Sequence, residues 1–599
     1  MKNFLIFLAI CFKTVCFSQL YVSPSNYVYV ADQFLFVKEQ VQLQNNSTLF
    51  LRKEAQLLQG SSTTSNNVGQ GKISIFQEGT VNAYQYNFWC SPIGNASISS
   101  GNENFGITML NAPTSLTNSN PANMISDTYE GIANPLGIAS YWIFKFIQSS
   151  TMSDWSQVGE ATSIAAGEGF TMKGTGGTDA TTVLGIQNNS GNNQRYDFRG
   201  KPNDGNITIS LANNQFTLTG NPYPSAIDLS AFLTAATNCT GVAYFWEQDK
   251  TTTSHLQSAY KGGYGTYAPI TRGGTGVYVP ATFYSYDGVG APTGVFSNPN
   301  NSYQRFFCPV GQGFMILGNN AGTTAVMNNS YRVFAKEGNA NFSQFERNTN
   351  SNTDFLPQIP SVSGFDYTQV SSLPVPQIRF NVLLNNQGIR QIVLAFEPTA
   401  TNGIDHGMDA TLPSETSPAD AYFSIQEKEY VLNVVPFDIN QRFPVGFKST
   451  DGSNFKITVK EILNFSEVEN VYLHDKINDV YHDIKNDFYD MDLATGDNFS
   501  QFEITFNNIT LSNNQAVKKD FIVFQNNTSK LLTIQNTNLL DIQSIQLFDI
   551  AGKQIFDLND LKINSKYELP TSNLADGIYV VRVKTEGNET LGQKIVIKN

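Results

Sequence analysis

The sequence predicts an all-β protein made of several domains. Only 15% of the residues are charged while 12% are aromatic, and Gly, Asn, Ser and Thr are abundant, a composition typical of β-rich chains. Short apolar runs recur between polar turns, and helical periodicity is nearly absent. A chain of 599 residues is long enough for roughly three to five domains. We therefore expect tandem β-sandwich-like modules that end in an Ig-like sandwich.

Residues 1–18 have the layout of a cleavable secretory signal peptide. Lys2 precedes an apolar run from Phe4 to Phe12, and this run is far shorter than the roughly 20 residues that span a bilayer. We expect export and no transmembrane segment. Removal of Lys2 and Lys13 leaves 35 basic against 50 acidic residues, a net charge of about −15. This charge argues against nucleic acid as a partner, because phosphate binding needs a concentrated basic surface.

Residues 19–80 form a region of short predicted strands. The apolar runs are "YVYV", "FLFV", "VQL", "LFL", "AQLL" and "ISIF", each only a few residues long and each followed by a polar turn. Narrow strands of this kind stack on one another. A small β-solenoid and a two-layer sandwich both fit the pattern.

Residues 81–344 contain an internal duplication. "FWCSPIG" at Phe88 is followed by "YWIFKF" and "AAGEGFTMKG", and "LTGNPYPSAIDL" at Leu218 is followed by "YFWEQD" and "PVGQGFMILG". Both halves run from a Pro-containing turn through an aromatic strand with Trp to a Gly-x-Gly-Phe turn. Self-similarity of this kind indicates a repeated structural unit.

Two further segments precede the C-terminal unit. Residues 345–377 are polar and Pro-rich, which is typical of a linker. Residues 378–512 hold alternating runs such as "IRFNVLL", "QIVLAF" and "FKITVKEI". Their spacing predicts a β-sandwich of roughly seven or more strands.

The sequence of residues 521–599 predicts an Ig-like sandwich. Gly552 and Gly577 each follow an Asp-containing turn, where we expect a positive φ. Ile578, Val580 and Val583 are expected to face the core of this unit.

This C-terminal unit resembles the type A C-terminal sorting domain of type IX secretion system cargo proteins. The resemblance rests on "LFDIAGKQIF", "LADGIYVVRV" and a final "QKIVI" followed by Lys598. The sorting-motif positions are Asp549, Gly552, Lys553, Gly577 and Tyr579. The resemblance implies Sec export to the periplasm, recognition by the type IX machinery, removal of the domain, and release or attachment to surface lipopolysaccharide.

The middle of the chain, about residues 20–510, resembles segments that recur in large secreted cargo proteins of the same class. The segments are "YNFWCSPIG", "FRGKPNDG", "LTGNPYPSAIDL", "GQGFMI" and "NNSYRVFAKEG". Many proteins with such segments are described as adhesin-like, and the resemblance implies no particular reaction.

The sequence holds no pattern that identifies a catalytic centre. It has no His-Glu-x-x-His, Cys-x-x-Cys, Gly-x-Ser-x-Gly or phosphate-binding Gly-rich loop. Asp405 and Asp409 flank Gly407 in a turn-rich loop, and carboxylates on such a loop suit Ca²⁺. We weigh calcium there against a solvated Asx-turn.

Two residue types leave alternatives open. Trp155 in "SDWSQ" is our candidate for a surface ring that stacks on a glycan, whereas Trp142 and Trp246 lie in apolar runs and are expected in the core. The mature chain keeps Cys90, Cys239 and Cys308. One disulfide or three buried thiols both fit, and wide spacing favours the thiols.

These observations predict a secreted or cell-surface binding protein with an adhesin-like role and no enzymatic activity. The sequence does not identify the ligand, and surface lipopolysaccharide and extracellular glycans are the candidate partners. A carbohydrate-active hydrolase or its accessory binding module is one alternative, since a carboxylate pair from separate strands leaves no sequence motif. A structural component of the surface layer is the other.

Overall fold

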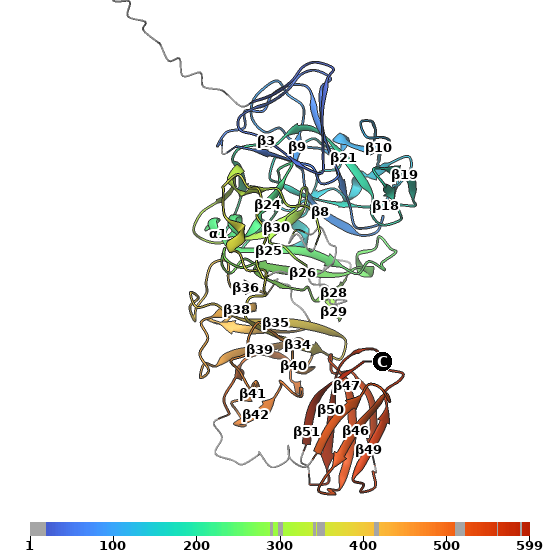
Figure 1. Ribbon diagram of the computed structural model, residues 1–599, viewed down its shortest axis with the longest axis vertical. Helices are drawn as coiled ribbons and strands as arrows, with labels where there is room; N and C mark the ends of the chain where they lie inside the picture. The colour runs from blue at the N-terminus through green and yellow to red at the C-terminus, as the bar shows by residue number, and fades with distance from the viewer. Residues whose placement is uncertain are drawn as a thin grey trace, which may run out of the picture.

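The computed structural model confirms the all-β fold class (Figure 1). It describes residues 19–60, 62–287, 292–296, 303–338, 343, 354–412, 418–508, 521–559, 561–587 and 590–598. The predicted signal peptide, residues 1–18, lies outside this part of the chain. Within it, the one α-helix is α1 (Leu229–Ala235), and no helix there is long and apolar enough to cross a membrane.

The N-terminal region is a short β-solenoid, drawn in blue in Figure 1, and the two-layer sandwich alternative is wrong. Successive strands stack in parallel, and Tyr27 lies opposite Thr48 one coil further along the chain. Parallel stacking of consecutive coils defines a solenoid. The stacks are β1 (Leu20–Val22) on β4 (Val41–Leu43), β3 (Phe34–Val37) on β6 (Gln56–Gln59), and β2 (Tyr27–Ala31) on β5 (Thr48–Arg52) on β7 (Lys72–Glu78).

The two similar halves of residues 81–344 make the same strand pairing. In the first half β8 (Tyr86–Cys90) pairs antiparallel with β17 (Gly169–Lys173), and Gly169 lies opposite Cys90. In the second half β23 (Phe216–Gly220) pairs with β31 (Gly313–Gly318), and Gly313 lies opposite Gly220. The last residue of the strand before each Pro-containing turn therefore meets the second Gly of each Gly-x-Gly-Phe turn.

The halves touch each other at these strands. Trp89 forms a β-bridge with Gln312, and a Cβ placed on Gly220 would lie 2.5 Å from the Cβ of Cys90. Only a glycine fits such a close approach.

Cys90, Cys239 and Cys308 are all buried free thiols.

The sheet that contains β23 and β31 continues through the larger strands of the second half and packs against the module that follows. It includes β25 (Cys239–Gln248), β26 (Lys261–Ala268), β28 (Phe283–Tyr286) and β29 (Pro292–Phe296). Tyr284, Tyr286 and Val295 belong to the same buried cluster as Ile378 and Phe380. The two modules therefore share a hydrophobic core.

The segment between these modules is packed along part of its length. Leu356, Tyr367 and Val370 are buried, and the Tyr367 hydroxyl donates a 2.8 Å hydrogen bond to the carboxylate of Asp228. Residues 345–353 of the predicted linker lie outside the described residues. The boundaries of the predicted domains stay a prediction.

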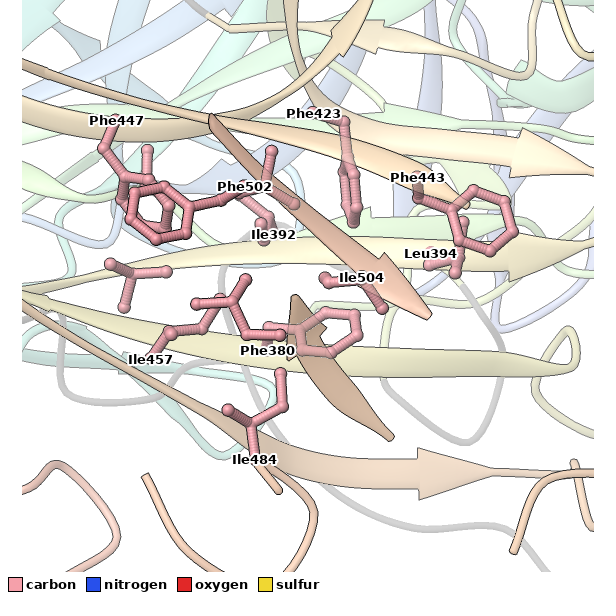
Figure 2. Packing of buried hydrophobic residues seen from close by; sticks show 14 of the residues in the cluster. Phe380, Ile392, Leu394, Phe423, Phe443, Phe447, Ile457, Ile484, Phe502 and Ile504 are labelled. Atoms are coloured by element: carbon pink, nitrogen blue, oxygen red, sulfur yellow. The ribbon is translucent and has the colours of Figure 1, made fainter. Parts of the chain in front are cut away.

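Residues 377–505 form one eleven-stranded sheet that wraps around a single core. Its longest strands include β34 (Gln377–Leu384), β35 (Gly388–Phe396), β38 (Lys428–Val435), β39 (Phe443–Ser449), β40 (Ser453–Leu463) and β44 (Gly496–Thr505). Figure 2 shows Phe380, Phe447 and Phe502 from three of these strands directed into the same interior. Alternate residues of a strand point to one face, which explains the apolar alternation in the sequence.

The C-terminal unit is the expected two-sheet sandwich, drawn in red in Figure 1. One sheet holds β45 (Phe521–Asn526), β46 (Leu531–Asn536) and β49 (Lys566–Pro570). The other holds β47 (Ile542–Asp549), β48 (Gln554–Asn559), β50 (Gly577–Thr585) and β51 (Thr590–Ile597). The core between them takes Tyr579, Val581 and Val583 from β50.

Three details of this unit differ from the expectation. Gly577 already lies in an extended strand opposite Ile597 and does not have a positive φ, because the bend precedes it. Ile578 is exposed. Val580 is buried, but on the outer face of its sheet against Phe488, since residues of even number on β50 point away from the sandwich interior.

Candidate functional site

The main candidate site is a cavity of about 390 Å³ between the two halves of the duplicated module. Its wall is almost entirely aromatic and includes three of the four tryptophans of the chain. A cavity of this size falls in the range of small-molecule sites. The lining residues are Tyr86, Phe88, Tyr141, Trp142, Phe144, Trp155, Thr171, Trp246, His255, Gln257, Tyr260, Tyr264 and Tyr286.

Both halves supply walls of this aromatic pocket. On β8, Tyr86 and Phe88 are two residues apart and face the pocket, whereas Trp89 points to the other side and is buried in the solenoid-facing core. On β25, Trp246 stacks on Phe88 with ring centroids 6.2 Å apart and planes inclined by 10°. The pocket is thus built from the strands that the duplication brings together.

The tryptophans are placed differently from the sequence-based expectation. Trp155 is half-buried, and its ring packs 4.8 Å from Phe146 and 5.8 Å from Phe88, so it forms one wall of the pocket. Trp142 is buried, as expected, and Trp246 is half-buried, and both also line the pocket. The signal that could have found them is their equivalent position in "YWIFKF" and "YFWEQD" of the two repeats.

Lys173 is buried behind the pocket wall among aromatic rings. Its Nζ lies 3.3 Å from the centroid of the Trp142 ring and 3.0 Å from Nδ1 of His255, and it donates to the Tyr260 hydroxyl. Burial lowers the pKa of Lys173 to about 6, because a low-dielectric environment disfavours the charged form. The Trp142 ring face partly offsets this cost by attracting the ammonium.

Two polar side chains of the lining have buried nitrogens without a hydrogen-bond partner in the described part of the chain. These are Nε2 of His255 and Nε2 of Gln257. Oε1 of Glu130 lies 3.7 Å from Nε2 of His255. Burial, and then the neighbouring Lys173, lower the pKa of His255. Buried polar atoms of this kind are candidates for ligand contacts.

The loop with Asp405 and Asp409 is braced by its own backbone. The carboxylate of Asp409 accepts hydrogen bonds from the amides of Asp405 at 2.7 Å and Val434 at 2.8 Å, and that of Asp405 accepts one from the amide of Thr401 at 2.6 Å. Burial raises the pKa of Asp409 to about 7. Among the described residues, no group of three or more His, Cys, Asp or Glu is placed to hold a metal. Calcium at this loop stays a prediction.

The sorting-motif residues lie at two places on the C-terminal sandwich. Gly552 has a φ of +80°, as expected, and the Asp549 carboxylate closes this turn by accepting from the amides of Ala551 and Lys553 at 2.9 Å. Tyr579 donates its hydroxyl hydrogen bond to the carbonyl of Ala575 at 2.9 Å. The turn and β50 therefore have well-defined conformations. Their role in sorting stays a prediction.

Comparison with known families places most of this architecture in one group. A family model described as a domain of unknown function (DUF8693) matches residues 9–506. The chain belongs to this family. The DUF8693 region thus contains the solenoid, the duplicated module with its aromatic pocket, and the eleven-stranded sheet.

The C-terminal part of this DUF8693 protein is a sorting domain for export. The model of the secretion system C-terminal sorting domain matches residues 523–598. The protein is therefore cargo of the type IX secretion system and is exported to the cell surface or the extracellular space. Neither family description names a reaction.

Solved structures add only distant likenesses to the DUF8693 protein, and no curated protein matches it. An immunoglobulin-like β-sandwich protein of the duf3244 family from Bacteroides vulgatus is 17% identical, with 13% of this chain and 85% of that chain covered and a TM-score of 0.12. SGBP-B of the mixed-linkage glucan utilization locus of Bacteroides ovatus, solved with a mixed-linkage heptasaccharide, is 11% identical, with 37% and 60% covered and a TM-score of 0.10. Both TM-scores are too low to support an argument.

Proposed function

We propose that this exported protein binds glycans in the aromatic pocket and thereby acts as an adhesin-like protein at the cell surface. The observation that carries the proposal is the pocket itself, a cavity of about 390 Å³ walled by rings from both halves of the duplicated module. We also propose that the exported protein stays attached to surface lipopolysaccharide and is not released into the medium.

The chemistry of a sugar matches such a wall. A pyranose ring presents C–H groups on its faces and hydroxyl groups at its edges. The faces of Trp and Tyr rings carry partial negative charge and attract C–H groups. Trp155 and Trp246 are both half-buried, so each keeps part of its surface free at the pocket.

The two alternatives predict other results. A hydrolase needs two carboxyl groups within about 10 Å across the scissile bond, and it releases reducing sugar. A structural component of the surface layer has no need of a saccharide ligand. One assay that records both bound protein and released sugar therefore distinguishes the hydrolase and the structural component from a binding protein.

The test uses purified residues 19–599 on a panel of polysaccharides and oligosaccharides, with Trp155→Ala and Trp246→Ala as variants. Tyr27→Ala is the matched control, because Tyr27 is an aromatic residue 64% exposed on the solenoid. We expect the wild type and the control to bind a glycan without releasing sugar, and each pocket variant to bind about tenfold or more weakly. Absence of binding, or equal binding by all four proteins, contradicts the proposal.

A further inference from the structure

We propose that the aromatic pocket selects sugars that carry acetyl groups, because the unpartnered polar atoms in its wall are hydrogen-bond donors. This inference rests on the proposed glycan binding and adds the chemical class of the ligand. It follows from the hydrogen-bonding state of His255 and Gln257 and from the way the other polar groups of the lining are already paired.

In the proposed arrangement, His255 carries its proton on Nε2. The Tyr260 hydroxyl donates to the carbonyl of Tyr84 at 2.5 Å, so its oxygen accepts from Lys173. Lys173 Nζ also lies 3.0 Å from His255 Nδ1, and the proposed arrangement takes Nδ1 as the acceptor of this contact. The carboxylate of Glu130 lies 3.7 Å from Nε2 and favours a proton there. His255 therefore offers an N–H group to the pocket.

Gln257 adds a second donor beside it. Its Nε2 is buried and has no hydrogen-bond partner among the described residues. An amide nitrogen donates and cannot accept. A ligand that occupies the pocket thus meets two N–H donors in its wall, one without a hydrogen-bond partner among the described residues and one 3.7 Å from the Glu130 carboxylate.

Other polar groups of the lining are already paired with the protein. Thr171 donates its hydroxyl to the carbonyl of Trp142 at 2.8 Å. The indole N–H of Trp142 donates to the carbonyl of Tyr129 at 2.7 Å, and that of Trp246 donates to Gln248 at 3.1 Å. The hydroxyl of Tyr286 donates to the carbonyl of Gly262 at 3.0 Å. These four groups hold the wall together, and His255 and Gln257 are the lining residues that we propose for recognition of the ligand.

An acetyl group is complementary to this arrangement. Its carbonyl oxygen only accepts hydrogen bonds, and its methyl group is apolar and packs against aromatic rings. A free hydroxyl at the same place brings its own donor, and a buried donor beside two other donors stays unsatisfied at a cost. An acetamido or O-acetyl substituent therefore binds better than the bare hydroxyl.

The experiment compares one neutral polysaccharide in its O-acetylated form and after alkaline deacetylation, together with N-acetylglucosamine and glucose oligomers of equal length and linkage. We expect the full mature protein to bind each acetylated form about tenfold or more tightly than its partner. Gln257→Met removes one donor without adding charge and is expected to reduce this ratio. His255→Phe keeps a ring beside Trp142, where the rings now lie 5.3 Å apart, and is expected to do the same. Gln33→Met on the solenoid, an exposed glutamine, is the control.

The outcomes separate this inference from the proposed function. Binding of acetylated and bare sugars with equal affinity, or an unchanged ratio in both pocket variants, overturns the acetyl preference and leaves glycan binding standing. Failure of the wild type to bind any saccharide overturns both. A reduced ratio in Gln257→Met and His255→Phe, with the ratio retained in Gln33→Met, supports the inference.

Discussion

Arg582 of the sorting domain forms a two-point ion pair with Asp487 of the DUF8693 region. Its Nε and Nη2 lie 3.2 and 3.0 Å from the two carboxylate oxygens, and Nη2 also donates to the carbonyl of Phe488 at 2.9 Å. Beside this pair, Val580, Phe548 and Phe488 form a small buried cluster. The sorting domain is therefore docked on the eleven-stranded sheet through a specific contact.

Replacing Arg582 by Ala is expected to loosen this docking. The change removes charge-assisted hydrogen bonds, each typically worth about 1.5–3 kcal/mol, and leaves the Asp487 carboxylate desolvated without its partner. We expect amide hydrogen exchange at β50 and at Phe488 to accelerate about tenfold or more. Lys566→Ala, which breaks an exposed ion pair with Glu568, is the control and should change exchange little. Equal exchange in the two variants would contradict a specific contact.

Gly592→Ala tests the same interface without altering charge. A Cβ on Gly592 would lie 2.2 Å from a carboxylate oxygen of Asp487, so the two surfaces must separate to accept it. We expect undocking, seen as a larger radius of gyration in small-angle scattering, while the sorting domain itself stays folded. Gly587→Ala is the matched control, because its Cβ would meet only the Thr585 hydroxyl oxygen at 3.6 Å. An unchanged scattering profile for Gly592→Ala is the contrary result.

The buried Lys173 makes stability depend on pH. Its pKa is lowered from 10.5 to about 6 on folding, so between these values the unfolded state holds one more proton than the folded state. The free energy of unfolding therefore rises with pH in this window, by at most about 1.4 kcal/mol per pH unit from this group. We expect Lys173→Met to flatten the rise measured by denaturant titration from about pH 6 to 9. Lys428→Met, at an exposed lysine, should leave the slope as in the wild type, and identical slopes in all three proteins would refute the assignment.

Deletion of Phe521–Asn599 should stop export at the periplasm. The deleted segment contains the matched sorting domain, residues 523–598, while the signal for entry into the periplasm is expected at the other end of the chain. Cell fractionation and immunoblotting of the culture medium, surface and periplasm measure the outcome. Normal secretion of the truncated chain would contradict a role of the sorting domain in export.

Binding of Ca²⁺ at the Asp405 loop would make the melting temperature of the protein depend on the Ca²⁺ concentration. A cation that binds only the folded state raises its stability by mass action, so added Ca²⁺ should raise the melting temperature of the wild type and not that of Asp405→Asn. Mg²⁺ serves as the control ion, since it requires a tighter octahedral shell. Identical melting in Ca²⁺ and in a chelator would leave Asp405 and Asp409 as braces of the loop alone.

The fold class was predictable because strand signals are local. Alternation along β34 and β50, and the turn at Gly552, depend on neighbouring residues. Solenoid and sandwich could not be separated in residues 19–80, because that choice depends on whether Tyr27 meets Thr48 in parallel, a long-range pairing. The outward burial of Val580 escaped prediction for the same reason, since its partner Phe488 lies in another module.

The aromatic pocket was only partly predictable. Trp155 could be singled out because its flanking residues are polar, but its neighbours Phe88 and Phe146 come from other segments. Trp142 and Trp246 look like core residues in their own strands, and only the packing of one repeat against the other leaves a cavity between them. Lys173 gave no signal at all, because a buried ammonium is recognised by its surroundings and not by its sequence context.

Tyr286 lines the aromatic pocket and also belongs to the buried cluster of the eleven-stranded sheet. Between the pocket and the eleven-stranded sheet, a pulling force on a bound glycan would therefore pass through packed side chains. Tension would reach the pocket wall directly, and the lifetime of the attachment would depend on how well that shared core resists shear.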